Sequence, residues 1–230
     1  MRSVIFTILL LLLGTELVAQ TKKELTIEAV AGYSDTRNLY GGADISFAFR
    51  SDASSAIVNL EALSSKDLAI GISARPQWTL EKGRFFLDGT MHSRMFASYE
   101  CYEFVYAGSA ALDFRHFLVQ AGLYSRMIAD SNMKWHSLEQ INSEPFNLLY
   151  RVSLKLKGDD APWDLVATCS DFTEYEYERH WQPIFSLQGR YRIDEKLDLL
   201  AEGVLKPAGM FHLDASFYAA WLKLGLKYTF

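Results

Sequence analysis

Apolar and polar side chains alternate one by one along most of this chain, most strictly in residues 223–230. One side of that stretch carries Leu224, Leu226, Tyr228 and Phe230, and the other carries Lys223, Gly225, Lys227 and Thr229. Successive side chains of a β-strand point to opposite faces, so this period of two predicts a strand with one apolar face. Such a strand would be adhesive at the edge of a soluble sheet, whereas in a transmembrane barrel the last strand pairs with the first. The pattern therefore favours a membrane barrel.

Segments of the same kind, separated by turns, extend along the chain. We predict an all-β, antiparallel transmembrane β-barrel of about twelve strands, with ten or fourteen as alternatives. The twelve segments are 24–33, 41–50, 55–63, 68–80, 84–96, 102–114, 116–128, 146–157, 163–175, 183–193, 196–206 and 219–230. Short polar turns alternate with mostly longer loops, which is typical of the periplasmic and extracellular ends of such barrels. A soluble sandwich or lipocalin-like barrel would also alternate, but the many arginines on the polar face argue against it.

The polar face of these strands is predicted to line the lumen. Its eight acids are Glu28, Asp44, Glu61, Asp88, Asp113, Asp164, Asp198 and Glu202. Its twelve bases are Arg50, Arg75, Arg84, Arg94, Arg126, Arg151, Lys155, Arg190, Arg192, Lys206, Lys223 and Lys227. The excess of four bases contrasts with the net charge of -5 for the whole chain. An open lumen of this kind would favour anions, whereas paired acids and bases could instead fill the interior.

Six of these bases are the candidate lumen and solute-binding residues: Arg94, Arg126, Arg151, Lys155, Arg190 and Lys223. The expected function is a passive or gated pore, or a binding barrel, for a small and preferentially anionic solute. The alternatives are a rim-active outer-membrane enzyme acting on lipid or peptide, and a closed structural or accessory barrel of an envelope complex.

The start of the chain resembles a targeting segment. Residues 1–19 combine the basic Arg2, an apolar run over 4–13 and a plausible cleavage site before Gln20, which predicts a signal peptide. Residues 20–230 would then form one barrel domain. The acidic balance of the chain argues against a nucleic-acid partner. Cys101 and Cys169 are predicted to be free thiols on opposite sides of the wall, rather than a disulfide.

Catalytic chemistry finds little support in the sequence. His212 and Asp214 could share one face near the extracellular rim, and His136 and His180 lie in predicted loops. No GxSxG, HExxH or cysteine–histidine metal spacing accompanies them, so we predict no catalytic residue, metal or cofactor. The long loop 130–144 could fold inward and constrict the lumen, and the acidic-aromatic rim 174–181 could bind divalent cations.

The final residues also resemble a family signature. Lys223, Gly225, Tyr228 and Phe230 fit the C-terminal signal read by the barrel-assembly machinery. Residues 144–150, 182–187 and 207–211 look like a Bacteroidota family of outer-membrane barrel proteins. The strands are also faintly similar to the barrels of TonB-dependent receptors, although there is no room for a plug domain. The resemblance implies an outer-membrane location, contact with outer-membrane lipid and barrel-assembly machinery during biogenesis, and it implies no activity.

Overall fold

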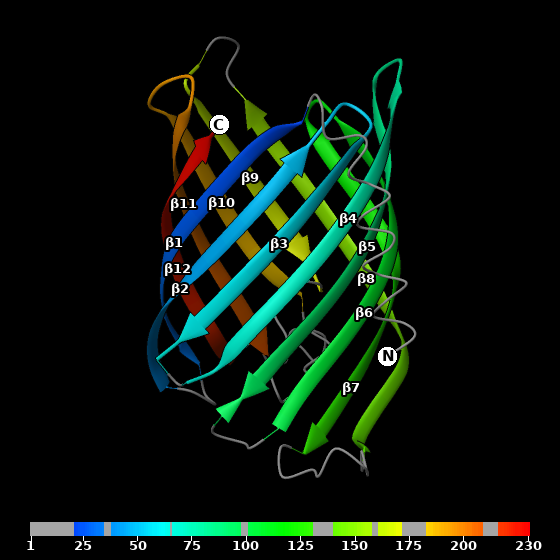
Figure 1. The fold of residues 1–230 in the computed structure, drawn as a ribbon, viewed down its shortest axis with the longest axis vertical. Coiled ribbons are helices and arrows are strands. Elements are labelled where there is room, and N and C mark those ends of the chain that lie inside the picture. Colours follow the sequence, from blue (N-terminus) through cyan, green and yellow to red (C-terminus); the bar gives the residue numbers. More distant parts are fainter. Residues whose placement is uncertain are drawn as a thin grey trace.

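Twelve antiparallel strands close into a tilted barrel in the computed structural model of the chain (Figure 1). It describes residues 21–34, 38–64, 66–97, 101–130, 140–157, 161–171, 183–208 and 216–230. The strands are β1 (Lys22–Ser34), β2 (Asn38–Arg50), β3 (Ser54–Leu63), β4 (Leu68–Leu80), β5 (Gly83–Phe96), β6 (Cys101–Phe114), β7 (Phe117–Asp130), β8 (Gln140–Lys157), β9 (Trp163–Ser170), β10 (Ile184–Arg192), β11 (Leu197–Ala208) and β12 (Ser216–Thr229). Each strand pairs with the next, and β12 pairs with β1. The predicted twelve-stranded antiparallel barrel is confirmed.

Two strand ends differ from the prediction by five residues or more, and the others differ by at most three. β8 begins at Gln140 instead of 146, because residues 140–147 continue to pair with β7 across two register shifts that interrupt the alternation. Residues 140–144 of the expected loop 130–144 are therefore strand. β9 ends at Ser170 instead of 175. At Asp171 a side-chain oxygen accepts a 2.8 Å hydrogen bond from the backbone N–H of Tyr150, while the Asp171 N–H donates to the Tyr150 carbonyl at 3.2 Å.

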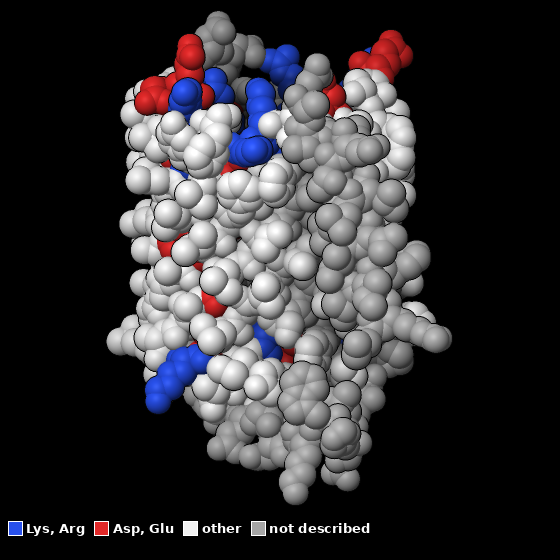
Figure 2. Space-filling model, viewed as in Figure 1, with Lys and Arg blue, Asp and Glu red and all other residues white. Residues whose placement is uncertain are grey.

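The outer face of the barrel is apolar and exposed. In β12, Leu222, Leu224 and Leu226 are about half exposed, whereas the inward-facing Trp221 and Lys223 are buried. Charged side chains gather at the end of the barrel that carries the short turns, and they are sparse over the waist (Figure 2). A continuous apolar band of this kind fits the hydrocarbon core of a membrane and would be a liability in water. Among the described residues, no helix is long and apolar enough to cross a membrane.

Aromatic rings border the apolar band near the short turns. Trp78 lies 5.5 Å from Phe85, Phe114 lies 4.6 Å from Phe117, and Tyr228 lies 5.0 Å from Phe230, between ring centroids. Amphipathic or apolar rings at this level are typical of the interfacial girdle of outer-membrane barrels.

The two cysteines are free, as predicted. Cys101 is buried on the inner side of β6, and Cys169 is partly buried on the outer side of β9. Because one thiol points inward and the other outward, the wall itself separates them.

The seam between β1 and β12 depends on a glycine. A Cβ atom placed on Gly225 would lie 2.5 Å from Glu28 Cγ and 2.5 Å from the backbone oxygen of Ile27. We expect Gly225→Ala to lower the free energy of unfolding by about 1–3 kcal/mol, because overpacking forces the strands apart. Urea unfolding of refolded protein in detergent measures this without involving cellular assembly. Gly203→Ala is the matched control, since a Cβ there meets nothing within 4 Å; equal midpoints for the two variants would contradict the steric argument.

Candidate functional site: the barrel lumen

The lumen is polar and hollow towards the short turns. Three cavities of about 400, 550 and 440 Å³ lie along it. Val166 on β9 lines all three, and Arg190 or Lys155 joins them in pairs, so the cavities adjoin one another. We call them the rim cavity, the basic vestibule and the middle cavity, in that order. Together they form a polar space at the short-turn end, which we call the wet interior because its charged lining favours water.

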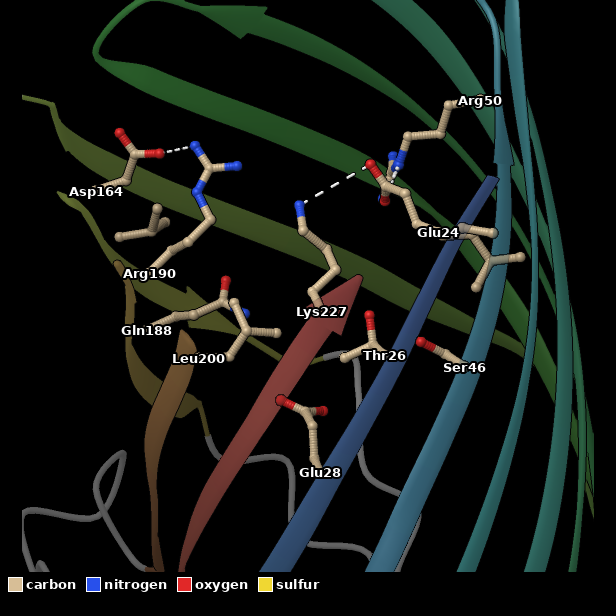
Figure 3. A pocket seen from close by; sticks show the side chains of 13 residues that line it. Glu24, Thr26, Glu28, Ser46, Arg50, Asp164, Gln188, Arg190, Leu200 and Lys227 are labelled. Carbon is tan, nitrogen blue, oxygen red and sulfur yellow. Dashed lines mark hydrogen bonds and ion pairs between the residues drawn. The ribbon is translucent and has the colours of Figure 1, made fainter. Parts of the chain in front are cut away.

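The rim cavity contains equal numbers of acids and bases. Figure 3 shows Glu24 and Lys227 facing Asp164 and Arg190 across the space. Glu24 accepts a 2.7 Å hydrogen bond from the guanidinium of Arg50 and lies 3.9 Å from Lys227 Nζ. Arg190 donates to Asp164 on the neighbouring strand. Because these side chains are partly exposed, each ion pair stabilises the fold only modestly.

One wall of the middle cavity is acidic. Asp44 on β2 and Glu61 on β3 lie directly opposite each other in register, and Asp44 also lies opposite Glu28 on β1, which lines the rim cavity. Adjacent carboxylates repel each other, and two bases offset this repulsion. Lys223 Nζ lies 3.3 Å from Asp44, and the guanidinium of Arg94 lies 3.0 Å from Glu61.

The facing wall of the middle cavity is basic and rich in hydroxyl groups. It consists of Arg151, Ser153, Thr168 and Ser170 on β8 and β9. Ser153 and Thr168 share a 2.9 Å hydrogen bond between their hydroxyls. A solute in this cavity would therefore meet carboxylates on one side and hydrogen-bond donors on the other.

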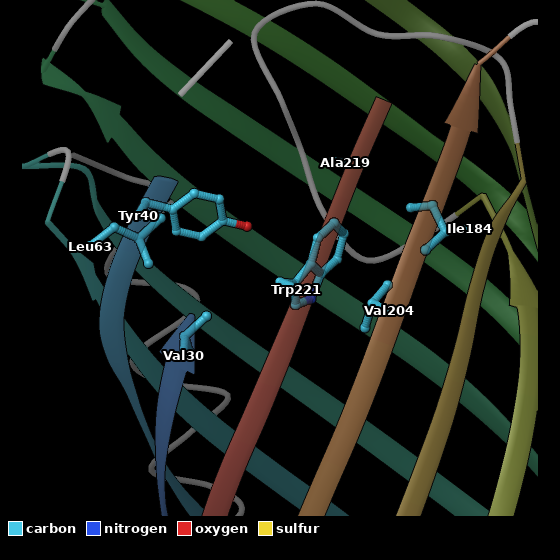
Figure 4. Close-up of a cluster of buried hydrophobic side chains, with 7 residues drawn as sticks. All are labelled: Val30, Tyr40, Leu63, Ile184, Val204, Ala219 and Trp221. Carbon is cyan, nitrogen blue, oxygen red and sulfur yellow. The ribbon is translucent and has the colours of Figure 1, made fainter. Parts of the chain in front are cut away.

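The half of the lumen towards the long loops is packed with buried apolar side chains, among which lie a few buried polar ones such as Glu103 and Arg126. One buried cluster, which we call the apolar plug, comprises Val30, Tyr40, Leu63, Ile184, Val204, Ala219 and Trp221. Figure 4 shows these side chains projecting inward from β1, β2, β3, β10, β11 and β12, with the ring of Tyr40 directed towards Trp221. Gly32 makes room for this approach, because a Cβ there would lie 2.7 Å from the ring of Tyr40 and from Trp221 Cβ.

Two further apolar clusters lie on the opposite strands. Phe96, Cys101 and Ile128 form one, and Val105, Tyr124 and Leu149 form the other. All six side chains are less than 5% exposed. Because Trp221, Val204 and Ile184 also line the middle cavity, the wet interior ends on the apolar plug.

The six predicted lumen bases all lie on inward-facing positions. Arg94, Arg151, Lys155 and Lys223 share the middle cavity, and Arg190 lies at the rim and vestibule. Arg126 stands apart: its guanidinium is 3% exposed and lies 2.6 Å from the fully buried Glu103. Lys155 likewise donates to Asp113. Arg94, Arg126, Lys155, Arg190 and Lys223 thus each lie beside a carboxylate, and Arg151 lines the middle cavity.

The predicted excess of four lumen bases is wrong. Glu24 and Glu103 also point inward, where they pair with Arg50 and Arg126. Among the strand side chains that the structure describes, adding these two acids to the eight predicted ones gives ten against twelve bases, an excess of two. Their alternation with the outward-facing Leu25 and Phe104 could have identified both.

The remaining predicted residues divide by location. In β12, Lys223 and Gly225 face inward and Tyr228 faces outward, with Phe230 beyond the strand end. His92 lines the middle cavity. His136, His180, His212, Asp214, the rim 174–181 and residues 1–19 lie outside the described residues. Within the described part of the chain, no group of three His, Cys, Asp or Glu side chains could hold a metal ion.

Comparison with known proteins shows a shared fold. No protein-family model and no curated protein sequence matches the chain. The structure is similar to the KdgM porin (TM-score 0.56, 8% identity, 89% of this chain and 99% of that one). It is similar to the translocator domain of the autotransporter NalP from Neisseria meningitidis (0.55, 13%, 99% and 96%) and to the NanC porin (0.52, 7%, 88% and 98%). The fold is thus that of outer-membrane β-barrels.

Proposed function

We propose that this chain is a bacterial outer-membrane β-barrel through whose lumen a small solute passes or binds, with a preference for anions. The observation that carries the proposal is the set of three adjoining cavities lined by charged side chains inside a closed barrel. Charged groups facing water inside an apolar wall are the means by which such barrels select ions. Two of the structurally similar proteins are named porins, which supports this proposal.

The proposal includes a location and an assembly route. The segment 1–19 acts as a signal peptide, and both ends of the barrel face the periplasm because they lie beside the short turns. Lys223, Gly225, Tyr228 and Phe230 form the C-terminal signal for the barrel-assembly machinery. Outer-membrane lipid surrounds the apolar band. No cofactor and no catalytic step belongs to this function.

The apolar plug makes the pore gated rather than permanently open. Apolar constrictions in a channel exclude water and so stop ions. The same observation supports a second candidate, a barrel that stays closed and acts as a structural or accessory partner of another envelope protein. The two candidates differ in whether any condition produces conductance.

Planar bilayers test the proposed function directly. We expect discrete channel events at low open probability, and a reversal potential in a potassium chloride gradient that reports higher permeability for chloride than for potassium. The preference should be modest, because the excess of lumen bases is only two. Events with clear potassium preference would contradict the anionic solute. Complete absence of events would favour the closed barrel instead.

A further inference from the structure

Positive charge in the lumen is concentrated in one cavity. The basic vestibule of about 550 Å³ lies inside the short-turn mouth, where charged side chains also gather on the surface (Figure 2). Its bases are Lys82, Arg84, Arg115, Lys155 and Arg190, and its acids are Asp113 and Asp164. The rim cavity has three of each sign, and the middle cavity has four bases and three acids. Among the described residues that line each cavity, only those of the vestibule give an excess of three bases over acids.

The bases of the vestibule converge instead of pointing apart. Arg84 donates to Asp113 Oδ2 at 2.9 Å, and Lys155 donates to the other oxygen of the same carboxylate. Two cations, one on β5 and one on β8, thus meet at one carboxylate on β6. Their side chains remain 53% and 26% exposed, so donor groups are still available to the cavity. Arg190, at the side of β10, is 31% exposed and adds a further guanidinium.

This arrangement has a definite ligand chemistry. Guanidinium groups bind the oxygens of phosphate in a two-pronged geometry, and a lysine adds a compact charge beside them. Because bases outnumber acids by five to two among the described lining residues, an anion with two or more charges fits better than a monovalent one. We propose that the basic vestibule is a binding site for a multivalent oxyanion, such as a phosphate-bearing solute, at the periplasmic mouth. The biological role of this site rests on the proposed function, whereas the binding of the anion does not.

The site can be tested without any channel activity. The full-length protein, refolded in detergent, is titrated with pyrophosphate in a calorimeter at constant ionic strength, with acetate as the monovalent probe. We expect saturable pyrophosphate binding and no saturable acetate binding. Arg84→Gln should weaken binding about tenfold or more, because it removes charge-assisted hydrogen bonds. Lys155 still neutralises Asp113 in that variant.

Matched variants separate the site from general charge. Arg192→Gln removes a base at the same mouth that does not line the vestibule, and it should bind pyrophosphate as the wild type does. The double variant Lys82→Gln/Arg115→Gln changes only turn residues and should also weaken binding. Equal weakening in the Arg192 variant, or no saturable binding by the wild type, would overturn the site. Saturable pyrophosphate binding without any channel events would support the vestibule site and contradict the proposed pore.

One further measurement identifies the source of the phosphate group. Phospholipid headgroups carry the same chemistry as a soluble phosphate ester, so a lipid with a phosphate monoester head is titrated in mixed micelles. Competition between this lipid and pyrophosphate would place a membrane lipid at the mouth. Unchanged pyrophosphate affinity supports a soluble solute within the lumen.

Discussion

Replacing Trp221 with alanine will raise both the open probability and the single-channel conductance of the barrel severalfold. Trp221 is 4% exposed and forms the boundary between the middle cavity and the apolar plug. Removing its indole connects the wet interior to the space beside Tyr40, and water that enters there allows ions to follow. The fold will also lose about 3–5 kcal/mol, the usual cost of truncating a buried tryptophan. Planar-bilayer recordings at fixed voltage measure the effect.

The control for this variant is an aromatic residue of the outer wall. Trp78 is 48% exposed on the outer side of β4, so Trp78→Ala should leave conductance unchanged while it weakens the interfacial girdle. The double variant Tyr40→Ala/Trp221→Ala should conduct more than either single variant. A Trp221→Ala protein that is folded yet conducts no more than the wild type would show that the apolar plug is not the gate.

Breaking the ion pair between Arg126 and Glu103 will cause the largest loss of stability of any single charge removal in the lumen. Both side chains are buried, and their N and O atoms lie 2.6 Å apart. Glu103→Gln leaves the guanidinium charge without its carboxylate in a region packed with apolar side chains. We expect a loss of about 3–5 kcal/mol, because removing one partner of a buried ion pair costs far more than removing one partner of an exposed pair. Guanidinium unfolding in detergent, followed by tryptophan fluorescence, measures it.

Two further variants test the reason for that loss. Arg50→Gln removes a base whose side chain is 44% exposed and should cost no more than about 1 kcal/mol. Glu103→Leu/Arg126→Met removes both charges and should recover most of the stability lost in Glu103→Gln. If the double variant is as unstable as the single one, packing rather than charge explains the effect.

The sequence predicts the wall of this barrel well and its interior poorly. Alternation identifies all twelve strands, because each side chain obeys one local rule about facing lipid or lumen. Alternation does not predict the end of β9, where the carboxylate of Asp171 accepts the hydrogen bond of the Tyr150 N–H. Alternation also does not predict the start of β8, because register shifts interrupt the period of two there.

The interior depends on contacts that no local pattern encodes. Arg94, Lys155 and Lys223 can be placed in the lumen from parity, but their carboxylate partners come from other strands and follow from register. The alternation of apolar and polar residues also does not predict the apolar plug, since Trp221 occupies an inward position expected to be polar. The one sign of the plug in the sequence is this aromatic residue on the lumen-facing side of a strand. Only the closed barrel shows that Tyr40 packs near it.

The pairing of β12 with β1 has a consequence for how the barrel forms. Glu24 lies opposite Thr229, so the contacts that complete the cylinder join the two most distant parts of the sequence. Such non-local pairing makes folding slow, because a long loop must close before the contacts stabilise it. Until then, both outer strands expose backbone groups that hydrocarbon cannot satisfy. We therefore expect insertion to be all-or-none, so that a chain cut within any single strand yields no partial barrel in the membrane.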